Sequence, residues 1–186
     1  FGICALIACF LRKKSGIKNK REYSWKRSLS LTHTAVALGC IPAILVFVFA
    51  PELFAKRSDA LVQATSYIQE TSEKPDYFFV FSMIAFIAAW VAVTEEVIFR
   101  FLLVSVLRRW SYFKTQKKRD LFAVLFSAFI FGLAHYASWG AVASLALFGL
   151  GIGFALAYIA VGENLGPVLL YHFIFDVLSI SVSIFS

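Results

Sequence analysis

Long apolar segments dominate this chain and limit what it can fold into. They lie near residues 1–11, 30–50, 77–107, 121–138, 140–161 and 165–185. All except the first, which is short at its start, are long enough to cross a hydrocarbon core about 30 Å thick. Hydrophobic residues make up 60% of the chain, a share too high for an ordinary soluble domain. We therefore predict an all-α, polytopic transmembrane bundle of about six helices.

Basic residues are concentrated in two connections between these segments. The connection after the first segment holds Arg12, Lys13, Lys14, Lys18, Lys20, Arg21, Lys26 and Arg27, and the one after the third holds Arg108, Arg109, Lys114, Lys117, Lys118 and Arg119. Because short cytoplasmic loops are rich in Lys and Arg, we predict that loops 12–29 and 108–120 face the cytoplasm. The net charge of +7 is thus explained by a lipid bilayer as partner, and no nucleic-acid partner is expected.

The first part of the chain carries few other signals. It begins at Phe1 with no initiator Met and no basic residues ahead of its apolar run, so we expect an excised fragment without a signal peptide. We expect residues 1–77 to hold the N-terminal membrane helices with their two loops, and residues 78–186 to form a catalytic helical core. Cys4, Cys9 and Cys40 lie in apolar runs without paired spacing, which favours buried free thiols.

The connection at 51–76 is predominantly acidic, which places it on the side opposite to the basic loops. Within it, Leu61, Ala64, Tyr67 and Ile68 recur at helical spacing. This pattern allows one short helix lying at the membrane interface. A solvated loop with local helix explains it equally well.

Ionisable residues interrupt three of the segments, although a charge at the centre of a membrane helix costs about 3 kcal/mol. Glu95, Glu96 and Arg100 lie in the third segment, His135 in the fourth, and His172 and Asp176 in the sixth. With a rise of about 1.5 Å per helical residue, all of these side chains fall in one middle band of the bilayer. Such groups must be paired, hydrated or used in function.

Helical spacing separates these residues into two sets. Glu96 and Arg100 are four residues apart, so we predict a structural ion pair between them. Glu95 points about 100° away from Glu96 and lacks that partner, which makes it a candidate general base. His172 and Asp176 are also four apart and project from one helix face. His135 alone is explained as well by packing.

In chain order, Glu-Glu-x-x-x-Arg, Phe-x-x-x-His and His-x-x-x-Asp on successive membrane helices resemble the CPBP family of intramembrane proteases. This family includes the type II CAAX prenyl endopeptidases and bacterial proteins linked to bacteriocin processing and self-immunity. The resemblance covers roughly residues 78–180. It implies an intramembrane endopeptidase that hydrolyses a peptide bond in or next to the membrane. The implied substrate is a peptide or membrane protein, with prenylated ones included.

The resemblance also implies roles for individual residues. Glu95 would activate a water that His135 helps to hold or deprotonate. His172 and Asp176 would orient the water or substrate and stabilise the oxyanion, or would bind a metal. Glu96 and Arg100 would remain the structural pair.

Two positions depart from the family pattern. Phe101 stands where Gly is frequent, which alters local helix packing. Asp176 stands where the prenyl-protein proteases often have Asn. An ionised Asp is a poor donor to an oxyanion but a good metal ligand or orienter of His172, whereas a protonated Asp can still donate. A prenylated substrate is therefore left open.

A metal site is the second open question. His135, His172 and Asp176 are a ligand set that can bind Zn²⁺ and leave one position for water. The compact His-Glu-x-x-His spacing of soluble zinc proteases is absent. A metal-free route with Glu95 as base needs no further ligands, so both routes remain, and no other cofactor is expected.

Two other classes of function fit the same residues. In a proton-coupled transporter, the carboxylates and imidazoles would form a relay, although the chain lacks the internal repeats common in transporters. A non-catalytic scaffold or immunity protein would keep the protease fold without the reaction.

The fifth segment lacks ionisable residues before Glu163 and carries Gly149, Gly153 and Ala157 at four-residue intervals. Small residues at this spacing allow helix backbones to approach closely in lipid. We predict that this helix is a scaffold that packs the catalytic helices together. Trp139, near the non-cytoplasmic end, is expected to be an interfacial anchor.

Overall fold

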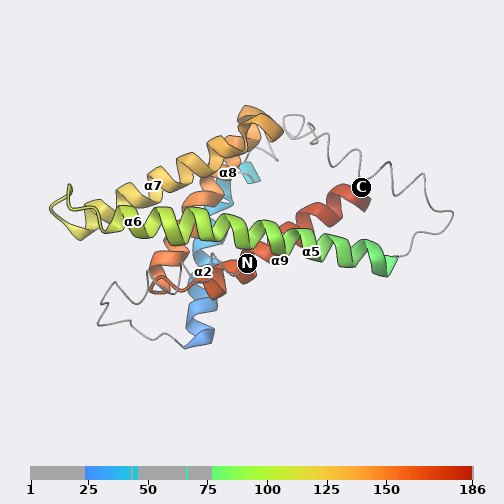
Figure 1. Cartoon of the computed structure of the whole chain (residues 1–186), viewed down its shortest axis with the longest axis horizontal. Coiled ribbons are helices and arrows are strands. Elements are labelled where there is room, and N and C mark those ends of the chain that lie inside the picture. The colour runs from blue at the N-terminus through green and yellow to red at the C-terminus, as the bar shows by residue number, and fades with distance from the viewer. Residues whose placement is uncertain (1–23, 43, 46–65, 67–76, 186) are drawn as a thin grey trace.

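The protein is a bundle of helices (Figure 1). The computed structural model describes residues 24–42, 44–45, 66 and 77–185, and these form helices and their connections without any strand. The elements are α2 (Trp25–Gly39), α5 (Tyr77–Glu95), η2 (Glu96–Val104), α6 (Ser105–Arg108), α7 (Gln116–Ala134), α8 (Tyr136–Ala160) and α9 (Leu165–Phe185). The predicted all-α class is confirmed. The first apolar segment, Cys4, Cys9 and the candidate interfacial helix lie outside the described residues.

The third apolar segment forms one continuous rod that runs across the whole molecule (Figure 1). It consists of α5, η2 and α6, and it ends one residue beyond the predicted range of 77–107. Its middle part, η2, is a π-helix, whose hydrogen bonds join residues five apart. The motif Glu96 to Arg100 lies in this wider turn rather than in an ordinary α-helix.

Two helices in the described part of the chain are long and apolar enough to span a bilayer. These are Phe78–Arg108 and Tyr136–Ala160, and Leu165–Ser181 is a shorter apolar helix. The remaining predicted crossings stay predictions.

The α7–α8 hairpin differs in detail from its prediction. We predicted a single break near residue 139, between the segments 121–138 and 140–161. In the structure, α7 ends at Ala134 and the chain turns at His135. A second departure from helical geometry occurs at Gly140, where φ is +77°. Glycine adopts this left-handed conformation without the Cβ clash that other residues meet, which is why the helix bends at this position.

The small residues of α8 bring backbones close together, as predicted, but the partner of two of them is α2. A Cβ on Gly153 would lie 2.7 Å from the Ala35 carbonyl oxygen, and one on Gly149 would lie 2.9 Å from the Gly39 carbonyl oxygen. Contact with α7 uses Gly151 instead, opposite Ala128. The stripe at 149 and 153 therefore joins α2 to the bundle, which corrects the expectation that it packs the catalytic helices.

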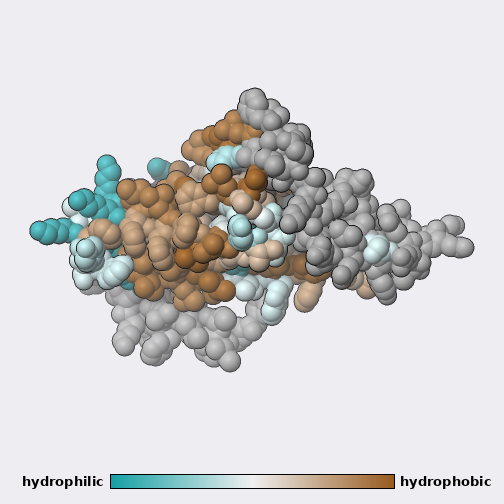
Figure 2. Space-filling view, turned by 90° about the horizontal axis from the view of Figure 1, so that it is seen from above, coloured by the Kyte–Doolittle hydropathy of each residue, from teal (hydrophilic) through white to brown (hydrophobic). Residues whose placement is uncertain are grey.

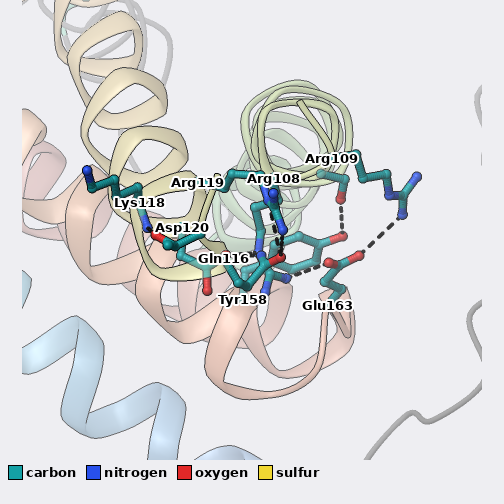
Figure 3. Close-up of polar contacts among 10 residues, drawn as sticks. Arg108, Arg109, Gln116, Lys118, Arg119, Asp120, Tyr158 and Glu163 are labelled. Carbon is teal, nitrogen blue, oxygen red and sulfur yellow. Dashed lines mark hydrogen bonds and ion pairs between the residues drawn. The ribbon is translucent and has the colours of Figure 1, made fainter. Parts of the chain in front are cut away.

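Ion pairs hold one end of the bundle together (Figure 3). Arg108 donates to Asp120 Oδ1 at 2.7 Å and also to Glu163, which accepts a further bond from Arg109. Nearby, the hydroxyl groups of Ser105 and Tyr158 lie 3.0 Å apart. These contacts connect α6, α7 and the turn between α8 and α9.

Candidate active site

Glu95 lies between two imidazoles that come from distant parts of the chain. It is the last residue of α5, directly before the π-helix begins. Its Oε1 lies 3.5 Å from Nε2 of His135, at the α7–α8 turn, and its Oε2 lies 3.5 Å from Nε2 of His172, on α9. The candidate base and both candidate histidines therefore face one another.

Asp176 completes this group from one turn further along α9. Its Oδ2 lies 3.6 Å from His172 Nε2, so the predicted shared face of His172 and Asp176 is present. The same oxygen is buried and has no hydrogen-bond partner among the described residues. It is thus a polar atom directed into the cluster, which accepts when Asp176 is ionised and can donate when it is protonated.

The predicted pair of Glu96 and Arg100 is also present, and it is completely buried. Arg100 Nε lies 3.4 Å from Glu96 Oε2, and neither side chain has any exposed surface. The other carboxylate oxygen, Oε1, lies 2.8 Å from Nδ1 of His172. Glu96 is therefore not confined to the structural pair that was expected, because it also contacts a site histidine.

Aromatic rings surround the buried guanidinium. Arg100 Cζ lies 4.6 Å from the ring centre of Phe131 and 5.2 Å from that of Phe154, within range for cation–π attraction. The Phe154 ring also stacks on His172, with centroids 4.8 Å apart and an interplanar angle of 20°. Sequence reasoning noted Phe131 only as a motif position and missed Phe154, which nothing in its local sequence distinguishes from other apolar residues.

The hydrogen bond of His135 to the backbone fixes where its neutral ring carries hydrogen. His135 Nδ1 lies 2.7 Å from the carbonyl oxygen of Phe131. A carbonyl can only accept, so Nδ1 must be the donor, and the neutral ring presents a bare Nε2 to Glu95. Two acceptors then face each other, and a proton must lie between them. A water molecule or a protonated imidazole supplies it.

The fit of these residues to a metal is a separate question. Among the described residues, no group of three or more His, Cys, Asp and Glu side chains is arranged to hold one ion. A metal site at His135, His172 and Asp176 stays a prediction, and hydrolysis with Glu95 as base does not require it.

The comparison with protein families covers this site. A family model described as type II CAAX prenyl endopeptidase Rce1-like matches residues 77–178, which is more than half of the chain. The chain belongs to this family. The Rce1-like family is a membrane-embedded protease family, and its match spans nearly the same residues as the resemblance seen in the motifs. No curated protein and no solved structure gives a significant match.

The matched region of the Rce1-like chain contains all six residues singled out by the motifs. Four of them, Glu95, His135, His172 and Asp176, form the facing group. Glu96 contacts this group through His172, and Arg100 contacts Glu96. The contact between Glu96 and His172, 76 residues apart, could not be obtained from spacing rules, which apply only within one helix.

Proposed function

We propose that this Rce1-like protein is an intramembrane endopeptidase in which Glu95 activates the attacking water. The observation that carries the proposal is the position of Glu95, with each carboxylate oxygen 3.5 Å from an imidazole Nε2 on a different helix. A water held by Glu95 and His135 would be bound by two acceptors, and we assign the removal of its proton to Glu95. This arrangement suits general base catalysis.

In the proposed reaction, Glu95 takes a proton from the water while the water oxygen attacks the carbonyl carbon of the scissile peptide. The carbonyl oxygen becomes an oxyanion, which we place near His172 and Asp176. The Glu95 carboxyl group then returns its proton to the leaving nitrogen as the C–N bond breaks. The products are a carboxylic acid and an amine, which become a carboxylate and an ammonium by proton exchange, so atoms and charge balance with a single water consumed.

The proposed substrate is a peptide segment that reaches the site from the membrane. A helical segment would have to unwind first, because its backbone groups are otherwise hydrogen-bonded and shielded. The family description names CAAX prenyl endopeptidases, so prenylated peptides belong in the substrate class to be tested. Asp176 takes the place of a frequent Asn, so unprenylated membrane peptides belong there too.

We also propose that the chain crosses the membrane several times, with loops 12–29 and 108–120 on the cytoplasmic side. A Cβ on Gly166 would lie 3.5 Å from the Trp25 ring, so the starts of α2 and α9 are neighbours. Glu163, just before α9, contacts Arg108 at the end of α6. The start of α2 and the end of α6 therefore lie at the same end of the bundle, in keeping with the positive-inside rule.

The test compares purified wild type with Glu95→Gln on a panel of prenylated and unprenylated membrane peptides. Because Gln cannot take the proton, we expect the cleavage rate to fall at least about 10²-fold without loss of folding. Glu163→Gln is the matched control, since it removes a carboxylate from the ion-pair end, and its cleavage rate per folded molecule should be unchanged. Full cleavage by Glu95→Gln would refute the assigned base.

Two additional measurements separate the alternatives. Cleavage that persists with a chelator and does not rise with added Zn²⁺ supports the metal-free route. Loss of cleavage with the chelator and its recovery with Zn²⁺ would show that the reaction requires a metal. Proton or solute flux in liposomes without any peptide cleavage would favour a transporter. If the Glu95→Gln variant fully restored function in cells that lack the gene for this protein, a non-catalytic scaffold would be favoured.

A further inference from the structure

Glu96 connects a buried cation to a histidine of the candidate site. Its Oε2 faces Arg100 Nε at 3.4 Å, and its Oε1 faces His172 Nδ1 at 2.8 Å. Glu96 and Arg100 have no exposed surface, and the His172 side chain is only 3% exposed. Solvent therefore cannot easily substitute for either contact.

The charge of Arg100 determines which atoms carry hydrogen along this chain of contacts. Arginine is a donor only, and its partner Glu96 is therefore expected to be an ionised carboxylate, which can only accept. The 2.8 Å contact between Glu96 Oε1 and His172 then requires hydrogen on Nδ1 of His172. In the neutral ring, Nε2 is left bare and faces Glu95 and Asp176.

We propose that Glu96 is a positioning residue that fixes the tautomer and ring orientation of His172. This inference rests on the proposed function and deepens it, because the residue pattern alone had assigned Glu96 only to a structural ion pair. Stacking on Phe154 fixes the plane of the His172 ring, and the bond to Glu96 fixes its rotation within that plane. In this tautomer, His172 can hydrogen-bond an oxyanion only as the imidazolium, whose proton at Nε2 comes from solvent and stays on the ring through the reaction.

The substitution Glu96→Gln tests this without changing the size of the side chain. Arg100 requires an acceptor, so the Gln carbonyl oxygen should turn to Arg100 and its amide NH₂ group should face His172. Nδ1 would then have to accept, and hydrogen would move to Nε2. The amide variant is therefore expected to reverse the tautomer of His172, whereas Glu96→Asp keeps an acceptor and should retain it.

Nitrogen-15 NMR of ring-labelled histidine in the full-length protein measures this directly. The chain has three histidines, so His33→Gln and His135→Gln assign the His172 signals. We expect hydrogen on Nδ1 of neutral His172 in wild type and in Glu96→Asp, and on Nε2 in Glu96→Gln. His135, which bonds to a backbone carbonyl, should keep its tautomer in the Glu96 variants and is the internal control.

Cleavage kinetics provide the second readout. A wrong tautomer in a catalytic imidazole lowers turnover by up to about 10⁴-fold, so Glu96→Gln should reduce kcat by about 10²-fold or more, with little change in KM. Glu96→Asp should recover part of it.

Hydrogen on Nε2 of His172 in the wild type overturns the proposal, and so does an unchanged tautomer in a folded Glu96→Gln. If that variant does not fold, the wild-type and Glu96→Asp spectra still test the proposal, because both must show hydrogen on Nδ1 of neutral His172. Should the tautomers behave as expected while wild type cleaves no peptide, the protease assignment fails and the positioning role of Glu96 stands.

Discussion

Arg100 is a permanent cation without any exposed surface, in surroundings that are otherwise apolar. The rings of Phe131 and Phe154 and the carboxylate of Glu96 offset part of the cost of removing it from water, since its guanidinium nitrogens have no hydrogen-bond partner among the described residues. Removal of one member of such a pair is more harmful than removal of both, because it leaves an uncompensated buried charge.

At this residue we expect Arg100→Met to destabilise the protein by about 3–5 kcal/mol, since Glu96 would be left buried without its cation. The double variant Glu96→Gln with Arg100→Met should recover much of this loss. Denaturation in detergent measures both. Arg109→Met is the matched control, because Arg109 is 49% exposed and its ion pair should be worth less than about 1 kcal/mol. Equal stability of Arg100→Met and wild type would contradict the expectation.

The residue pairs show what spacing can predict. Glu96 with Arg100 and His172 with Asp176 follow from four-residue spacing within one helix, and both are found. The approach of Glu95 to His135 and His172 was expected only from a common depth and from a family resemblance. Phe154 could not be singled out, because its role comes from what α8 packs against rather than from its neighbours in the sequence.

Among the elements, α8 packs mainly against α2 and α7, whereas α5 packs against α9. The glycines of α8 meet α2 on one side and α7 on another. Their spacing predicted close approach, but four-residue intervals do not identify the partner. The position of the α7–α8 turn was also inaccurate, because His135 and Tyr136 continue an apolar run without a glycine or proline to mark the break.

At this element, Gly153→Ala should separate α2 from α8 because the new methyl group would lie 2.7 Å from a backbone oxygen that cannot move alone. We expect a loss of about 1–3 kcal/mol, typical of overpacking, measured by thermal denaturation. Gly166→Ala is the control, since the nearest atom to its Cβ would be 3.4 Å away. A Gly153→Ala protein as stable as Gly166→Ala would show that the contact is not tight.

At the scale of the whole molecule, large hydrophobic side chains lie on the outside. Phe78 is 82% exposed, Phe86 71% and Leu178 60%. Hydrophobic residues cover the middle of one face, and hydrophilic ones gather at one end of it (Figure 2). A soluble protein rarely exposes so much apolar surface, so lipid is the surrounding that this surface fits. Composition had predicted a membrane protein, and the membrane-embedded family confirms this.

The proposed orientation makes a prediction for the whole molecule. In a background without the three native cysteines, Lys118→Cys should react with a membrane-impermeant thiol reagent only from the cytoplasmic face. Ser138→Cys, which lies beyond the α7–α8 turn, should react only from the opposite face. Labelling in intact cells and in inverted vesicles measures both, and reaction of both positions from one side would rule out the arrangement.

Because each hydrogen-bonded ring of η2 encloses one residue more than an α-helical ring, the rod is locally underwound. Loss of Leu102 or Leu103 would let the remaining turns tighten to α-helical ones, so that Glu95 and Arg108 kept nearly the same relative orientation around the axis. The same loss within α6 would instead rotate Glu95 by about 100° relative to Arg108, and would separate it from both imidazoles while leaving every functional group in the chain.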